Sequence, residues 1–201
     1  MCRYDGGVEP MTAAAAAEYI EANLAMLRTD YIDLMLLHHV CRTPAETAAV
    51  WSVLEDFKRR GSLKAIGVSN FVKADIEALA TTATPGSISA NQCHFAVGQF
   101  DQATLASCVS HRIAVQSYST LNVPVGLQNP VIGAVAGRHN VSAAAVAFKY
   151  VSQRGIGIVT ASSSTAFDVE DAGIFEWGPL TTADMARATW PSSTRCRARP
   201  S

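Results

Sequence analysis

The sequence predicts an α/β fold with a parallel sheet, because short apolar runs alternate with amphipathic stretches along most of its 201 residues. Five runs have the length of strands, and the segments between them are long enough for helical crossovers. The run YIDLMLLHH (31–39) is nearly continuous, which is typical of a strand buried on both faces. The expected strands are 31–38, 64–69, 88–91, 113–118 and 156–160.

Helices are expected between these strands. Apolar residues recur at helical spacing in 12–27 and 45–60, and Gly61 follows the second stretch, where a helix end favours a positive φ.

A closed (β/α)8 barrel and an open doubly wound sheet both fit this alternation. A barrel of eight units needs about 250 residues, and no GxGxxG motif follows the first strand, so the residues indicate a partial barrel or an open sheet. Further helices are expected over 75–80, 102–110, 130–138 and 143–153, the last capped by Ser142.

The amino-acid composition argues against several classes of function. The chain is 49% hydrophobic and 16% charged, as expected for a globular domain with one core. The net charge of −1 argues against a nucleic-acid partner, and no apolar run is long enough for a membrane span or a signal peptide. Five scattered cysteines lack metal-ligand spacing, so we expect no metal site and a cytoplasmic location. We expect one domain over 1–190 and a disordered tail over 191–201.

Polar residues end every expected strand. In parallel α/β folds the carboxyl ends of the strands surround the ligand site, so these side chains should converge there. Taken singly, each has a structural explanation as a satisfied histidine, a helix cap or a packed tyrosine. Together, amides, hydroxyls and an aromatic ring without paired carboxylates suit a neutral planar ring that bears an amide. The residues are His38 and His39, Ser69 and Asn70, Asn91 and Gln92, Tyr118 and Ser119, and Ser162 and Ser163.

These segments resemble the aldo-keto reductase family. LRTDYIDLMLLHH (27–39) is similar to the family signature around its fourth strand, and VWSVLEDFKRRGSLKAIGVSNF (50–71) to the next helix and strand, ending in GVSNF. ISANQ (88–92) and IAVQSYSTL (113–121) resemble the sixth and seventh strands. VSAAAVAFKYVSQRGIGIV (141–159) resembles the segment before the cofactor phosphate motif. The resemblance runs in order over about residues 12–182 and implies a partial (β/α)8 barrel, strands 4–8, with the N-terminal units missing.

The resemblance implies an NAD(P)H-dependent oxidoreductase that reduces aldehydes or ketones to alcohols. His38 matches the catalytic histidine beside the substrate carbonyl. Ser69, Asn70 and Gln92 match residues that hydrogen-bond the nicotinamide carboxamide, and Tyr118 matches the aromatic residue that stacks on the nicotinamide ring. The remaining cofactor-binding matches are Ser119 and Leu121, along the pyrophosphate, and Ser162, at the phosphate of the adenosine ribose.

Departures from the family pattern lower the expected activity. No residue matches the family's general-acid tyrosine or its aspartate and lysine partners, which belong upstream of the matched segment. Ala161 and Phe167 stand where cations would meet the 2′-phosphate of NADP, so the implied cofactor is NADP(H), with NAD(H) as an alternative and little preference between them. Thr120 replaces a proline that stiffens a cofactor loop.

Three functional hypotheses therefore remain at the level of sequence. The first is a truncated and impaired carbonyl reductase acting on a small-molecule substrate. The second is a non-catalytic binding or regulatory relative, and the third is an incomplete gene product without a function of its own. Because three barrel units are absent from the match, we also expect an open sheet edge and self-association through it.

Overall fold

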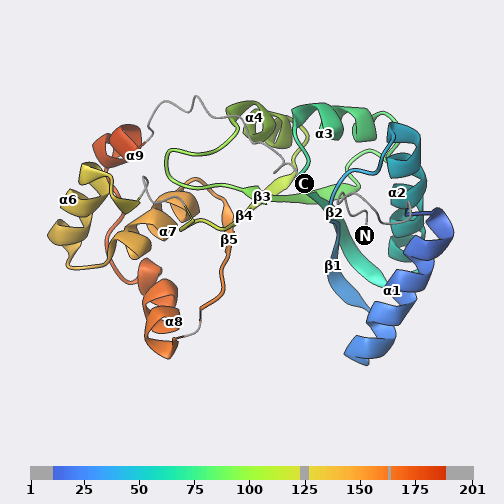
Figure 1. Cartoon of the computed structure of the whole chain (residues 1–201), viewed down its shortest axis with the longest axis horizontal. Coiled ribbons are helices and arrows are strands. Elements are labelled where there is room, and N and C mark those ends of the chain that lie inside the picture. Colours follow the sequence, from blue (N-terminus) through green and yellow to red (C-terminus); the bar gives the residue numbers. More distant parts are fainter. Residues whose placement is uncertain (1–10, 123–126, 163, 189–201) are drawn as a thin grey trace. The chain divides into compact units, whose positions relative to one another are not determined.

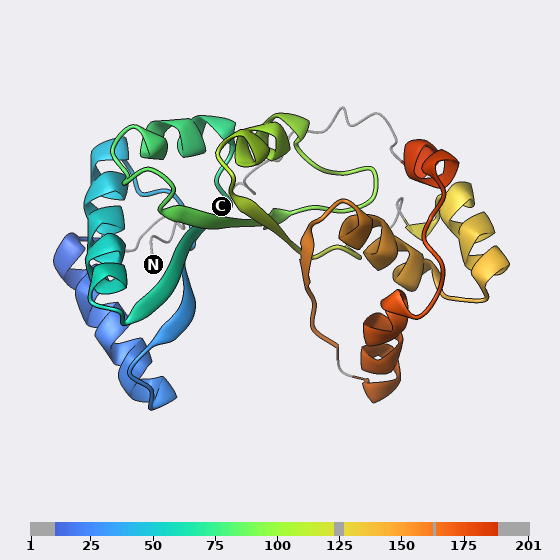
Figure 2. The same cartoon turned by 180° about the vertical axis from the view of Figure 1, so that it is seen from behind.

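The computed structural model describes residues 11–122, 127–162 and 164–188; the predicted tail lies outside them. Two compact units divide the chain. The first contains the residues up to Gln92 together with Gln102–Ala114, and the second contains Cys93–Asp101 together with the chain from Val115. Figures 1 and 2 show the elements of each unit from two sides.

All five expected strands form. In the first unit β1, β2 and β3 are neighbours in that order, and in the second β4 pairs with β5; the pairings are parallel, as predicted. The fifth strand lacks one residue at each end of its predicted range. The strands are β1 (Ile32–Leu37), β2 (Leu63–Ser69), β3 (Ile88–His94), β4 (Ala114–Tyr118) and β5 (Gly157–Val159).

The six expected helices form within a few residues of their predicted limits, and the described part of the chain after α7 adds two further α-helices and a 3₁₀ helix. Among the described residues no single helix is long and apolar enough to cross a bilayer; α6 and α7 pass that test only as a pair bent by 98°. The helices are α1 (Ala13–Leu27), α2 (Pro44–Arg59), α3 (Lys73–Ala80), α4 (Gln102–Ser110), α6 (Pro130–His139), α7 (Ala143–Gln153), α8 (Thr165–Ala172), η1 (Gly173–Phe175) and α9 (Thr182–Ala188).

Helix α2 illustrates how local sequence places these elements. Thr43 accepts the backbone N–H of Glu46, and the Glu46 carboxylate accepts the backbone N–H of Arg42, which satisfies two donors at the helix start. Pro44 occupies the first turn, where its missing N–H costs nothing. Beyond the helix, Gly61 adopts a φ of 86°, as predicted, and the chain turns into β2. The buried face consists of Thr47, Val50, Trp51, Leu54 and Phe57.

Strand β2 approaches β3 closely at Gly67. A Cβ atom on Gly67 would lie 2.6 Å from the carbonyl oxygen of Ala90, so a larger residue would force the two backbones apart. The register between the strands shifts next to this glycine, and beyond the shift Ser69 pairs with Gln92. Gly67 therefore permits the register that sets Ser69 opposite Gln92.

Strand β1 is less buried than its sequence predicts. Leu37 is its one fully buried residue; the others are half-buried or, at Asp33, exposed. Among the described residues β1 has β2 as its paired strand on one side and none on the other. The prediction of burial on both faces is therefore wrong for most of β1, because the strand lies at an edge.

Helix α7 forms the centre of the second unit, and every residue from Ala145 to Val151 is buried. Lys149 belongs to this run, and its ammonium donates to the carbonyl oxygens of Ile174 at 2.7 Å and Trp177 at 2.9 Å. The same ammonium lies 4.8 Å from the centroid of the Trp177 ring. A buried charge requires such partners, so these contacts bind η1 and the residues after it to α7.

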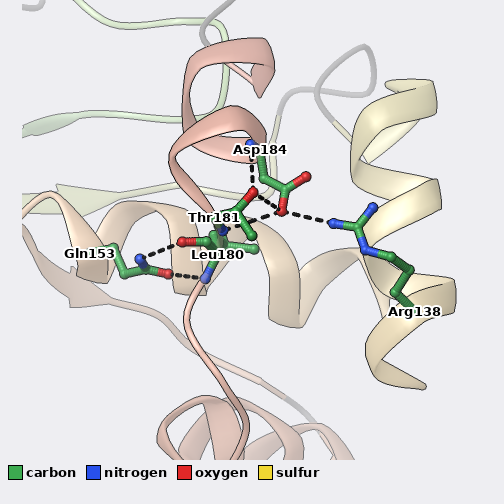
Figure 3. Close-up of polar contacts among 5 residues, drawn as sticks. All are labelled: Arg138, Gln153, Leu180, Thr181 and Asp184. Atoms are coloured by element: carbon green, nitrogen blue, oxygen red, sulfur yellow. Dashed lines mark hydrogen bonds and ion pairs between the residues drawn. The ribbon is translucent and has the colours of Figure 1, made fainter.

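Helix α9 is fixed by a cap and an ion pair (Figure 3). The Thr181 hydroxyl donates to the Asp184 carboxylate at 2.7 Å and accepts the backbone N–H of Asp184 at 3.1 Å. The same carboxylate accepts a 2.7 Å hydrogen bond from the guanidinium of Arg138, on α6. The side-chain amide of Gln153, on α7, exchanges two hydrogen bonds with the backbone of Leu180. The segment that leads into α9 is thus joined to two helices of its unit.

Candidate active site

Asn70 joins the ends of three strands in the first unit. It follows β2 directly and has a φ of 60°, a conformation that asparagine tolerates better than most residues. Its backbone N–H donates to the carbonyl oxygen of Gln92 at 2.9 Å. Its side-chain Nδ2 donates to the carbonyl oxygen of His38 at 3.0 Å and to the Ser69 hydroxyl at 3.1 Å. One residue therefore links the residue after β1, the end of β2 and the C-terminal half of β3.

Ser69 helps to orient the side chain of Asn70 through a hydrogen bond. The Ser69 side chain is buried, and its hydroxyl donates to the carbonyl oxygen of Gln92 at 2.8 Å. The Ser69 hydroxyl oxygen also accepts a hydrogen bond from the side-chain amide of Asn70. A serine has one hydroxyl hydrogen, and this hydrogen is used inside the protein. Ser69 thus orients Asn70, and its predicted contact with a cofactor stays a prediction; donation to a cofactor would require the bond to Gln92 to be exchanged.

His38 and Gln92 flank this network. His38 is exposed just after β1, and its ring packs on that of His39 with centroids 4.2 Å apart. Gln92 is half-buried in β3, where its neighbour Asn91 points to the opposite face and donates to the carbonyl oxygen of Phe71 at 2.9 Å. The structure brings together four of the predicted site residues, namely His38, Ser69, Asn70 and Gln92.

Tyr118 is the last residue of β4, in the second unit. Its half-buried ring meets the imidazole of His94 edge-on, with centroids 6.0 Å apart and an interplanar angle of 76°. Burial lowers the pKa of His94 below its usual 6.5, so this imidazole is neutral at pH 7. Sequence reasoning missed His94, although its spacing of two residues from Gln92 on one strand places both on the same face.

Buried hydroxyls hold the loop that follows β4. The Ser117 hydroxyl donates to the carbonyl oxygen of Phe95 at 2.6 Å. Thr120 therefore donates to Ser117, at 2.6 Å, because the Ser117 proton is already engaged. Ser119 has a φ of 53°, and its carbonyl oxygen accepts the N–H of Asn122 at 3.0 Å, which closes a turn. Thr120, the replacement for the family's proline, fixes this loop by hydrogen bonding instead.

Leu121 and Ser162 complete the predicted set. Leu121 packs against the hydrophobic core of the second unit. Ser162 is exposed, and its hydroxyl donates to the carbonyl oxygen of Ser164 at 3.0 Å and accepts its N–H at 2.9 Å. Strand β5 ends at Val159, so Ser162 lies three residues beyond the strand and not directly at its end; Ser163 lies outside the described residues.

Comparisons with known proteins identify the family. The model of the Aldo/keto reductase family matches residues 3–127. This chain belongs to the aldo/keto reductase family. Dihydrodiol dehydrogenase 3 of Bos taurus is 30% identical, over 83% of this chain and 60% of that protein. The uncharacterized oxidoreductase YtbE of Bacillus subtilis is 31% identical, over 91% of this chain and 62% of that protein.

Solved structures agree with the family assignment. The crystal structure of an aldo/keto reductase from Brucella melitensis matches with a TM-score of 0.82 and 25% identity, over 90% of this chain and 68% of that chain. The predicted family and fold class are confirmed: this aldo/keto reductase chain is an α/β protein that corresponds to strands 4–8 of a (β/α)8 barrel. The chain spans about 60% of the length of the curated relatives it matches.

Proposed function

We propose that this chain carries the cofactor-facing residues of an NAD(P)H-dependent site that reduces aldehydes or ketones to alcohols. The hydrogen-bond network of Asn70 is the observation that carries the proposal, because it joins two residues with side-chain amides, Asn70 and Gln92, to the backbone of His38. Such groups suit the carboxamide of nicotinamide, and family membership supports oxidoreductase chemistry. A bound nicotinamide would supply the hydride for the carbonyl carbon.

His38 is proposed to act on the substrate side. Its exposed imidazole can donate a hydrogen bond to the carbonyl oxygen, where negative charge develops as the alcohol forms. Asn70 holds the backbone carbonyl of His38, and the ring of His39 packs against the His38 ring, so the imidazole is restrained from two directions. These contacts favour a fixed donor, which is worth more than a mobile one.

The cofactor proposal distinguishes the two ends of the dinucleotide. Around Ser162 the chain offers no cation from residue 160 to residue 172, and α8 carries Asp168, Glu170 and Asp171. Burial, followed by repulsion from the other two carboxylates, raises the pKa of Asp171. A 2′-phosphate would meet negative charge here and does not fit these residues. We therefore infer little preference for NADP over NAD.

Titration of NADH and NADPH, followed by nucleotide fluorescence, tests this preference. The wild type should bind NADPH no more tightly than NADH, and Ala161→Lys should shift the preference toward NADPH, because the exposed Ala161 lies next to Ser162. A hundredfold preference of the wild type for NADPH, equivalent to about 2.7 kcal/mol, would contradict the inference. Tyr118→Ala should weaken both nucleotides, whereas Tyr19→Ala, at an exposed tyrosine of α1, should weaken neither.

Turnover tests the reductase proposal itself. The measurement is NADH and NADPH oxidation with a reactive aromatic aldehyde, using the wild type, His38→Ala and, as a control, the exposed His111→Ala. We propose that the chain by itself is slow, since nothing in it matches the family's acid tyrosine and a positioned proton donor contributes about 10²–10⁴-fold. Activity lost in His38→Ala and kept in His111→Ala supports the role of His38.

Two other results would point away from reduction. Cofactor binding without turnover at any aldehyde concentration favours the non-catalytic binding or regulatory relative. Failure to bind either nucleotide removes the basis of the proposal, since the network around Asn70 would then serve the fold alone.

A further inference from the structure

His94, the last residue of β3, has a side chain whose described interaction is a ring contact. The imidazole is half-buried, and among the described residues neither of its nitrogens has a hydrogen-bond partner. Its ring instead meets the ring of Tyr118 in a T-shaped contact, with centroids 6.0 Å apart and an interplanar angle of 76°. This separation lies within the range of favourable aromatic pairs. The contact with Tyr118 is therefore the interaction through which the His94 side chain can act.

The two rings are held next to each other by a buried hydrogen bond between their neighbours in sequence. The hydroxyl of Ser117 donates to the carbonyl oxygen of Phe95 at 2.6 Å, and both residues are buried. Phe95 also stacks on Phe100, with centroids 4.5 Å apart. A hydrogen bond between buried groups is costly to break, because each group would lose its partner. The backbone that carries the rings of His94 and Tyr118 is therefore fixed.

The T-shaped geometry restrains the Tyr118 ring without covering both of its faces. Rings inclined at 76° meet through the edge of one ring and the face of the other, so His94 covers at most one face of Tyr118. Because burial lowers the pKa of His94, both rings are uncharged at pH 7, as in an ordinary aromatic pair. One face of the Tyr118 ring thus remains uncovered by His94.

We propose that His94 is a positioning residue for the nicotinamide: its ring limits the rotation of the Tyr118 ring and so presents a face of that ring to the cofactor. This inference rests on the proposed function, in which Tyr118 contacts the nicotinamide end of the dinucleotide. Without His94 the Tyr118 ring has more orientations, and binding has to order it at a cost in affinity. Ligands that carry a nicotinamide should therefore bind more weakly, and a ligand that lacks it should not.

A role for His94 in packing alone predicts a different result. A side chain that only fills space can be replaced by an aliphatic residue of similar size at little cost. An aromatic edge, by contrast, can be supplied by phenylalanine and not by leucine. The variants His94→Leu and His94→Phe therefore separate packing from the ring contact.

The test is a fluorescence titration of NADH and NADPH with the 201-residue chain. His94→Leu should weaken both nucleotides by the same factor, about fivefold, which is the size of effect that one aromatic pair supplies. His94→Phe should restore most of the affinity. His94→Leu combined with Tyr118→Ala should bind no more weakly than Tyr118→Ala alone, because the ring that His94 positions is then absent.

ADP-ribose, which lacks the nicotinamide, is the matched control ligand. Its affinity, measured by displacement of NADH, should be the same for the wild type and His94→Leu. The inference is overturned by wild-type affinity of the leucine variant, by equal weakening in the leucine and phenylalanine variants, or by an effect that persists beside Tyr118→Ala. If Tyr118→Ala itself binds both nucleotides like the wild type, the proposed function fails instead.

A measurement on the wild type makes the test independent of how the variants fold. Thermal unfolding shows which variants are folded at the temperature of the titration. In NMR spectra of the wild-type chain, the imidazole resonances of His94 should shift when NADH is added and stay in place with ADP-ribose, since only NADH brings a ring to Tyr118. Equal shifts with both ligands, or no shift at saturating NADH, overturn the inference. Failure to bind NADH at all is the failure of the proposed function.

Discussion

The predicted ligand residues of the first unit and Ser162 of the second unit are held by different means. In the first, Asn70 bonds the backbone of a residue 32 positions away and Ser69 one 23 positions away, so strand pairing itself places the site. In the second, the bonds described for Ser162 reach Ser164, two positions away. Residues tied across strands cannot move without disturbing the sheet, whereas a locally bonded loop can. We expect substitutions in the first group to cost far more stability.

The largest difference is expected between two glycines. Gly67→Ala should destabilise the protein by about 3 kcal/mol, because its Cβ atom would overlap the Ala90 carbonyl and overpacking costs this much. Gly133→Ala, on an exposed face of α6 with nothing within 4 Å of the added atom, should instead stabilise by about 1 kcal/mol. Urea unfolding measures both. A Gly67→Ala variant as stable as the wild type would show that β2 and β3 can separate at this point without cost.

Asn70→Ala should cost about 2 kcal/mol, since two side-chain hydrogen bonds of about 1 kcal/mol each are lost. Asn70→Gly loses the same bonds but adopts the φ of 60° without strain, so it should unfold at a higher urea concentration than the alanine variant. Identical midpoints would mean that the backbone at position 70 relaxes freely. Both variants should also weaken nucleotide binding in the fluorescence titration.

A smaller effect is expected in the loop after β4. Thr120→Val removes the donor to Ser117 while keeping the shape, at a cost of about 1 kcal/mol. The exposed Thr165→Val is the matched control and should lie within about 0.5 kcal/mol of the wild type. A loss at Thr120 as large as that at Asn70, by chemical denaturation, would contradict this order of effects.

The smallest effect concerns pH. The hydrogen bond from Thr181, and next that from Arg138, lower the pKa of Asp184 below its usual 3.8. A lowered folded-state pKa means stabilisation that is complete above the unfolded pKa and lost as pH falls through the folded one. Asp184→Asn should cost less than about 1 kcal/mol at pH 7, since the Arg138 side chain is 52% exposed.

Urea midpoints measured from pH 6 down to pH 2 check this expectation. The wild type should lose stability more steeply than Asp184→Asn below pH 4, and the two curves should approach each other at the acidic end. Parallel curves over the whole range would show that Asp184 does not contribute through its charge.

Sequence reasoning located most of the fold because caps and apolar periods are local signals. Thr12 and Ser142 cap α1 and α7 through their hydroxyl groups, and Gly61 ends α2 with a positive φ. Helix α8 gave no such signal, since none of its residues is buried and Phe167 faces solvent. The length of β5 depends on its pairing with β4, which the apolar run before Ser162 does not encode.

For the site, residue types were predictable and atomic roles were not. The polar strand ends indicated His38, Asn70 and Gln92, and the structure groups them in the first unit. Whether the Ser69 hydroxyl turns toward a ligand or toward the next strand depends on the register that Gly67 permits. The neutral state of His94 follows from burial in the folded chain, which no local pattern reports.

Chemical labelling of Lys149 can measure local unfolding of the second unit. Its ammonium is buried and bonded to two carbonyl oxygens, so an acylating reagent cannot reach it until η1 and Trp177 leave α7. The exposed Lys64 reacts without any such opening. The ratio of their labelling rates, read by mass spectrometry, therefore reports how often this segment detaches in native conditions. The labelling rate of this buried lysine therefore measures the rate of local unfolding around α7.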